Sequence, residues 1–101
     1  MYLVEIFLPL YDNRGRRFPA ALYQAERERL VERFGGMTAH SQSPVKGLWQ
    51  EKGRTKRDEL VIFEVMVPKL DRRWWRSHRR QLEKIFKQKE LLVRAYRLVE
   101  L

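Results

Sequence analysis

The sequence predicts an α+β fold, in which four strands form one antiparallel sheet and two helices cover one of its faces. Two observations support it. Apolar residues alternate over residues 2–8 and 59–67, as in half-buried strands, and a stretch with helical spacing follows each of them, at 19–34 and 71–89. A chain of 101 residues is long enough for one modest core, so we expect a single domain over residues 1–101.

The first strand is expected at Tyr2–Leu8. Pro9 and the turn-forming sequence YDNRG that begins two residues later end this strand in a loop. Asp12 and Asn13 offer polar side chains to a ligand, but residues of these types first of all form turns. We therefore expect a turn at this place.

The first helix is expected from about Pro19 to Phe34, and the Gly35-Gly36 pair is its stop signal. A weaker strand follows, from Met37 to about Gln50, and the sequence SPVKG breaks it. The apolar side of the helix consists of Leu22, Ala25, Leu30 and Phe34.

The third strand is expected at Glu59–Val67. Asp71 stands where the N-cap of the second helix should be, and the helical spacing continues to about Lys89. A last strand is expected at Leu91–Glu100. The residues of the second helix that we expect to pack on the sheet are Trp74, Trp75, His78, Leu82, Ile85 and Phe86.

This order of elements, β-α-β-β-α-β, is that of a ferredoxin-like fold with strand order 4-1-3-2. The first and third strands are then central. Side chains alternate between the two faces of a strand, so the cleaner apolar set belongs to the helix side. That set is Tyr2, Val4, Ile6, Leu8, Val61, Phe63, Val65 and Val67.

The opposite face of the sheet is also mostly apolar. A face turned to water normally carries polar side chains, so this face should be covered, and a second copy of the chain is the simplest cover. We therefore expect a homodimer through the sheet face, in the manner of a dimeric α+β barrel. The side chains of this face are Leu3, Glu5, Phe7, Ile62, Glu64, Met66, Leu92, Arg94, Tyr96 and Leu98.

Glu5 and Glu64 lie near the centre of that face, where an unpaired carboxylate is costly. One interpretation is a structural charge network of Glu5 or Glu64 with Arg94 and Tyr96. The other is the polar floor of a ligand cavity, with Glu5 and Glu64 as candidates for proton transfer and Arg94 and Tyr96 as ligand contacts. Both interpretations stay open at this point.

Two further residues, His40 and Trp49, are expected at the mouth of such a cavity, on or near the edge strand. His40 and His78 are the only histidines, and neither stands at a metal-ligand spacing from a carboxylate. We expect no metal and no bound cofactor.

A net charge of +9 makes nucleic acid the alternative partner. Basic residues on the second helix recur every three or four positions and should form a solvent-facing stripe, although no aromatic RNA-binding motif lies on the strands. The stripe consists of Arg73, Arg76, Arg80, Lys84 and Lys87.

Cysteine is absent, which excludes disulfides and thiolate chemistry and fits a reducing compartment. The N-terminal segment MYLVEIFLPLY lacks a basic start and contains a glutamate, so it does not resemble a signal peptide. No apolar run approaches the roughly 20 residues that span a bilayer. We expect a cytoplasmic protein without a membrane partner.

Four segments resemble a family of small uncharacterised bacterial proteins: FLPLYDNRG, FGGMTA, GLWQ, and WW followed by RRQLEKIFKQ. The resemblance covers nearly the whole chain. It implies a ferredoxin-like fold of the dimeric α+β barrel type, but it supplies no catalytic residue because the family has no assigned activity. More distantly, the architecture is similar to antibiotic-biosynthesis monooxygenases and muconolactone isomerases, whose barrel dimers hold small organic molecules. We therefore expect a homodimer that binds a small organic molecule, and leave open whether it transforms it.

Overall fold

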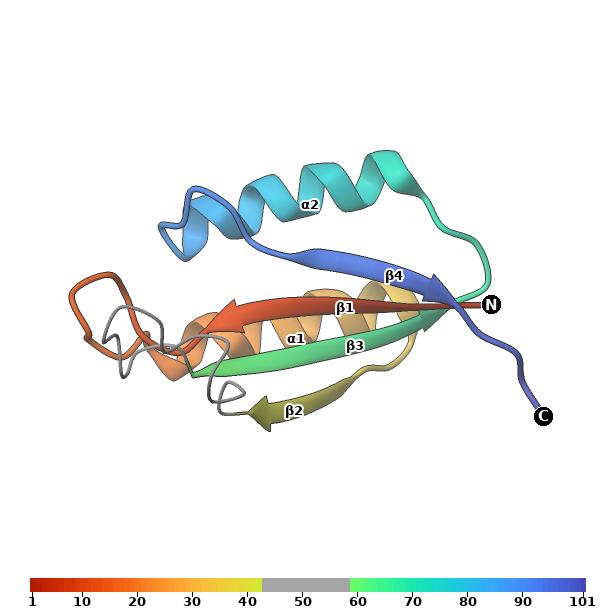
Figure 1. Ribbon diagram of the computed structural model, residues 1–101, viewed down its shortest axis with the longest axis horizontal. Coiled ribbons are helices and arrows are strands. Elements are labelled where there is room, and N and C mark those ends of the chain that lie inside the picture. The colour runs from red at the N-terminus through yellow and green to blue at the C-terminus, as the bar shows by residue number, and fades with distance from the viewer. Residues whose placement is uncertain (43–58) are drawn as a thin grey trace, which may run out of the picture.

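The computed structural model describes residues 1–42 and 59–101. It contains the predicted elements in the predicted order (Figure 1). They are β1 (Tyr2–Pro9), α1 (Ala20–Phe34), β2 (Thr38–Gln42), β3 (Leu60–Val67), α2 (Arg72–Ile85) and β4 (Val93–Arg97).

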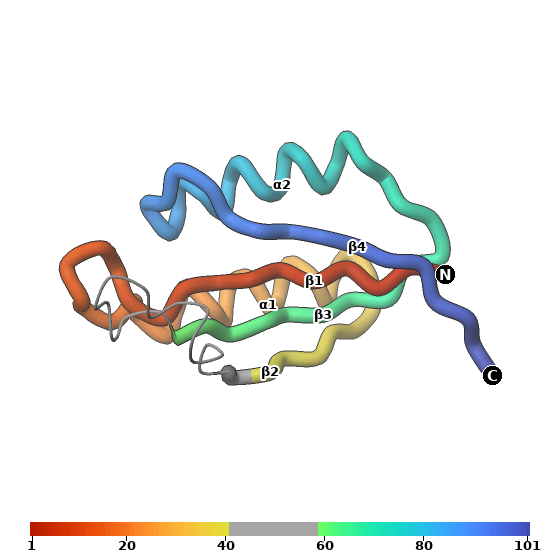
Figure 2. Tube along the Cα trace, in the orientation of Figure 1, coloured from red at the N-terminus to blue at the C-terminus, as the bar shows by residue number. Residues whose placement is uncertain are grey.

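The four strands form one antiparallel sheet in the order β2-β3-β1-β4, which is the predicted order read from its other edge. The ferredoxin-like fold is thus confirmed. Strands β1 and β3 lie at the centre, and both termini lie at the same end of the sheet (Figure 2). Glu5 on β1 is paired with Glu64 on β3 and with Arg94 on β4, so three charged residues follow one another across the sheet.

The core lies between the sheet and the two helices, and the alternation of the central strands explains it. Val4, Ile6 and Leu8 of β1 are almost fully buried, as are the matching odd-numbered residues of β3. Leu30 of α1 and Leu82 of α2 belong to the same buried cluster, so both helices cover this face. The predicted helix side of the sheet is confirmed.

Helix α1 ends as its sequence predicts. Gly35 adopts a left-handed conformation, with φ of 87°, and its N–H donates to the carbonyl of Val31. The predicted apolar side of α1 is incomplete, because Glu26 is fully buried together with Leu30.

Helix α2 begins at the predicted cap, where the Asp71 carboxylate accepts from the Trp74 N–H at 3.1 Å. It ends at Ile85, so the prediction of a helix to about Lys89 was wrong. The chain leaves the helix because Lys87 has a positive φ of 54°.

Two other predicted boundaries differ from the structure. Strand β4 is shorter than the predicted 91–100, and the N–H of Leu91 instead donates to the Glu83 carboxylate at 3.1 Å. Strand β2 is described over Thr38–Gln42, and the predicted continuation to about Gln50, with its break at SPVKG, lies outside the described residues.

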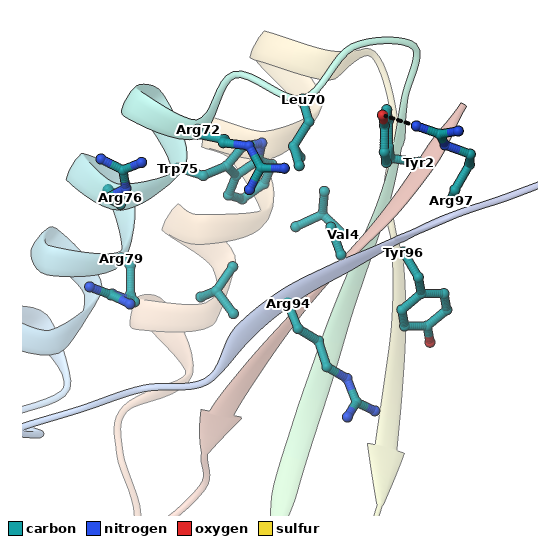
Figure 3. A pocket seen from close by; sticks show the side chains of 12 residues that line it. Tyr2, Val4, Leu70, Arg72, Trp75, Arg76, Arg79, Arg94, Tyr96 and Arg97 are labelled. Atoms are coloured by element: carbon teal, nitrogen blue, oxygen red, sulfur yellow. Dashed lines mark hydrogen bonds between the residues drawn. The ribbon is translucent and has the colours of Figure 1, made fainter.

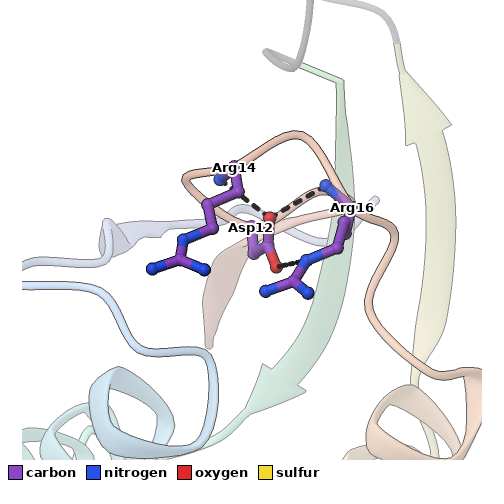
Figure 4. A network of polar contacts seen from close by, with 3 residues as sticks. All are labelled: Asp12, Arg14 and Arg16. Carbon is purple, nitrogen blue, oxygen red and sulfur yellow. Dashed lines mark hydrogen bonds and ion pairs between the residues drawn. The ribbon is translucent and has the colours of Figure 1, made fainter.

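The loop after β1 is the expected turn. The Asp12 carboxylate accepts from the backbone N–H groups of Arg14 and Arg16, both at 2.8 Å, and pairs with the Arg16 side chain at 3.3 Å (Figure 4). The hydrogen bond from the Arg16 backbone is the main reason why the pKa of Asp12 lies below its ordinary value. Asp12 is therefore used within its own loop.

Candidate functional site

The face of the sheet away from the helices, here called the open face, carries a row of ionisable side chains that crosses all four strands. Arg94 on β4 donates from Nε to Oε1 of Glu5 on β1 at 2.8 Å. On the other side of the row, His40 on β2 lies with Nε2 at 2.9 Å from Oε1 of Glu64 on β3. A carboxylate only accepts hydrogen bonds, so we take the histidine nitrogen as the donor.

Glu5 is the more deeply placed of the two carboxylates, with a side chain that is 9% exposed. Burial raises the pKa of Glu5, but the hydrogen bonds from Arg94 and Tyr96 and the positive charge of Arg94 outweigh burial and hold this pKa below its ordinary value. The same contact with Glu5 raises the pKa of Tyr96. Glu5 is thus held as a carboxylate by the partners that the strand pattern predicted.

Glu64 differs from Glu5 in both partner and exposure. Its side chain is 23% exposed, and its partner His40 is 46% exposed. Arg94, which was a predicted partner of either glutamate, pairs with Glu5 and with no other described carboxylate. Of the two carboxyl groups, Glu64 is therefore the one that solvent or a ligand can reach.

An apolar row runs beside the charged row, because Leu3 on β1 is paired with Met66 on β3 and with Tyr96 on β4. Met66 is 50% exposed and Tyr96 is 44% exposed. Ile62 was also expected to need a cover from a second chain, but it is only 7% exposed within one chain. That expectation was wrong for Ile62, and for the exposed Met66 end of the face it stays a prediction.

A hollow of about 420 Å³ lies next to Glu64 on the open face. Leu3, Thr38, Glu64 and Met66 line it from the strands, and the turn from Phe34 to Met37 closes one side. The hollow therefore combines one accessible carboxylate with exposed apolar side chains.

A second cleft, of about 290 Å³, lies on the helix side between α2 and the edge strand β4 (Figure 3). Arg72, Arg76 and Arg79 line it from α2, and Arg97 lines it from β4. Arg97 donates to the Tyr2 hydroxyl at 3.2 Å. This cleft was not predicted, because it depends on the spacing between a helix and an edge strand.

A buried charge cluster joins the two helices and was also missed. His78 Nε2 lies 2.7 Å from Oε2 of Glu26, and Arg29 Nη2 lies 3.0 Å from Oε1 of the same carboxylate. The expected packing role of His78 holds as well, since its ring stacks on Trp74 at 4.6 Å. One signal was available in the sequence, because Glu26 stands four residues from both Leu22 and Leu30 and so lies on the apolar side of α1.

The remaining predicted residues are placed as follows. All five residues of the predicted basic stripe are exposed, but only four lie on α2, because Lys87 follows the end of the helix at Ile85. A hollow of about 520 Å³ lies among Arg80, Lys84 and Lys87. Trp49, the second residue expected at the cavity mouth, lies outside the described residues.

Within residues 1–42 and 59–101, no three His, Asp or Glu side chains gather so as to hold a metal ion. In the same part of the chain, no helix is long and apolar enough to cross a bilayer.

No protein-family model matches the chain, and no curated protein matches it. The chain is similar in structure to a phage SAM lyase in complex with S-methyl-5'-thioadenosine, with a TM-score of 0.58 and 14% sequence identity. The match covers 94% of this chain and 79% of the lyase chain. At this identity the likeness shows the fold alone, and the resemblance to a family of small bacterial proteins stays a prediction.

Proposed function

We propose that the open face binds a small organic molecule at the hollow beside Glu64, in a homodimer in which two open faces meet. The observation that carries this proposal is the contrast between the two central glutamates. Glu5 has partners in Arg94 and Tyr96, whereas Glu64 is accessible and borders the hollow. A partly exposed carboxylate among apolar side chains fits a ligand that has hydrogen-bond donors at one end and an apolar part at the other.

The homodimer is proposed because the exposed apolar side chains of this face lie together. Leu3, Met66 and Tyr96 form one row across three strands, and a second copy would cover them. A two-fold pairing of open faces would also cover the hollow, so that the ligand would lie between the subunits. Strong desolvation there would strengthen each hydrogen bond to Glu64.

The structurally similar lyase suggests a first ligand to try. S-methyl-5'-thioadenosine has ribose hydroxyls and an adenine amino group as donors, and a thioether methyl as an apolar end. It therefore has the two kinds of group that Glu64 and Met66 could contact. His40 would hold the Glu64 carboxylate in place, and any transfer of a proton to or from the ligand would fall to Glu64.

The test is a titration with S-methyl-5'-thioadenosine, SAM and adenosine, followed by calorimetry and by backbone amide NMR. We expect saturable shifts at Leu3, Glu64 and Met66, and about tenfold weaker binding in Glu64→Gln, as for a lost charged hydrogen bond. Glu90→Gln is the matched control, since it removes the same charge from an exposed site on another segment. If no compound shifts the open-face amides at millimolar concentration, or if both variants weaken binding equally, the proposal is wrong.

A further inference from the structure

We propose that the cleft between α2 and β4 is a second binding site, specific for a small organic phosphate such as an aryl phosphomonoester. It lies on the helix side of the sheet, whereas the proposed site at Glu64 lies on the open face. The two proposals therefore rest on different residues.

The positions of the α2 arginines explain why they face one cleft. Arg72, Arg76 and Arg79 stand four and three residues apart, which places them along one side of a helix. Arg97 adds a fourth guanidinium from the β4 side, where it is joined to Tyr2 (Figure 3). Four arginines thus line a cleft of about 290 Å³.

Arg94 and Tyr96 also border the cleft, but their functional groups are used elsewhere. Arg94 donates to Glu5, and Figure 3 shows both side chains extending from β4 away from α2. They belong to the open face, because strand residues separated by an odd number of positions point to opposite faces, as Arg94 and Arg97 do.

The positive charge of the cleft arginines is balanced by few described carboxylates. No acidic residue is among the described residues that line the cleft, and no described carboxylate pairs with Arg72 or Arg76. Arg79 lies 3.6 Å from Glu83, but its Nε is buried and has no hydrogen-bond partner among the described residues. This Nε faces Glu83 on its own helix, so an anion in the cleft would instead meet the exposed side chains of Arg72, Arg76 and Arg97, which have no described carboxylate partner.

Phosphate is the anion that this arrangement fits best. One arginine satisfies a carboxylate through a bidentate pair, whereas a phosphomonoester has three terminal oxygens and up to two negative charges for several guanidinium groups. Besides the arginines and the two tyrosines, the lining residues are apolar, namely Val4, Leu70, Trp75, Val93 and Ala95. These apolar side chains fit the organic part of an ester. The cleft volume lies at the lower end of the roughly 300–1,000 Å³ range of ligand pockets, so the ester should be small.

The test compares phenyl phosphate with inorganic phosphate, benzoate and phenol, by calorimetry and amide NMR at fixed ionic strength. We expect phenyl phosphate to bind most tightly and to shift the amides of Arg72, Arg76 and Ala95. Phenol lacks the anion and should not bind.

Two double variants distinguish binding of the phosphate at the cleft from a non-specific attraction of anions to the basic helix. Arg72→Gln with Arg76→Gln removes two cleft charges and should weaken phenyl phosphate at least about tenfold, as expected for two charge-assisted contacts. Arg73→Gln with Arg80→Gln removes two exposed charges from the same helix outside the cleft lining, and should change the affinity less than about twofold. All four positions are solvent-facing, so both variants should fold.

Equal weakening by the two double variants would mean that a diffuse field attracts the anion, and the inference would be wrong. It would also be wrong if no phosphate binds, or if shifts appear only at the open face. Shifts at Leu3 and Met66 without shifts in α2 would support the site at Glu64 alone, so the two proposals can fail separately.

Discussion

Glu5 should contribute clearly more to folding stability than Glu64, although the two glutamates face each other across the centre of the sheet. Glu5 has a side chain that is 9% exposed and accepts from Arg94 at 2.8 Å. Its replacement by glutamine removes a charge-assisted hydrogen bond between a buried carboxylate and a guanidinium group that is 54% exposed, which costs about 1–2 kcal/mol once solvent screening of Arg94 is counted. For a chain of this length, each kcal/mol corresponds to a shift in Tm of about 4–8 °C.

Glu64→Gln should cost less than about 1 kcal/mol, the range of exposed ion pairs, because Glu64 and His40 are both partly exposed. The assay is urea unfolding of Glu5→Gln, Glu64→Gln, Arg94→Gln and the Glu5/Arg94 double variant. The double-mutant cycle should give strong coupling between Glu5 and Arg94. Each variant is measured at two protein concentrations, since dimer formation makes stability depend on concentration.

The pH dependence provides an independent check on Glu5. Its folded-state pKa lies below the ordinary value of 4.5, so its stabilising effect is complete above that value and is lost as pH falls through the lower folded-state pKa. The Glu5→Gln variant should therefore lose less stability than the wild type as the solution is acidified below pH 4.5. A Glu64→Gln variant that is as destabilised as Glu5→Gln, or a cycle without coupling, would refute this account of the open face.

Three further predictions concern assembly, the core and the basic helix. Met66→Lys should convert a dimer at micromolar concentration into a folded monomer in light scattering, because Met66 is half exposed in one chain; a monomeric wild type would contradict the proposed dimer. Glu26→Gln should lower the free energy of unfolding by about 1–3 kcal/mol in urea titrations, because it weakens the buried hydrogen bond with His78; a loss below about 1 kcal/mol would show that the carboxylate is dispensable. If the α2 stripe binds RNA, the affinity should fall by orders of magnitude between about 50 and 200 mM salt, and no binding at low salt would remove the nucleic-acid alternative. The variant for this last test replaces three stripe residues with glutamine, namely Arg80, Lys84 and Lys87.

The fold was predictable because its central strands have an unambiguous pattern. Val4, Ile6 and Leu8 alternate with Glu5 and Phe7, so a shift by one residue would expose the core set. The same alternation placed Glu5 and Arg94 on one face before any contact was known. Local patterns therefore predicted the half of the charged row that depends on β1 and β4.

The partner of Glu64 was harder to predict. His40 lies on β2, whose weak strand pattern does not specify which of its residues stands beside Ile62 and Glu64. The buried Glu26 was missed for a different reason, because charged residues are almost never fully buried without a partner, and its partner His78 is 52 residues away. The cleft at Arg79 depends on how far α2 lies from β4, which no local pattern contains.

Strand β4 separates two environments of different charge. Its even-numbered Arg94 turns to the open face, where Glu5 and Glu64 balance Arg94 and any charge on His40. Its odd-numbered Arg97 turns to the cleft, where the described lining residues are basic or uncharged. The two sides of β4 therefore differ in charge, since the side toward α2 belongs to a basic cleft and the other side belongs to the face that contains two carboxylates.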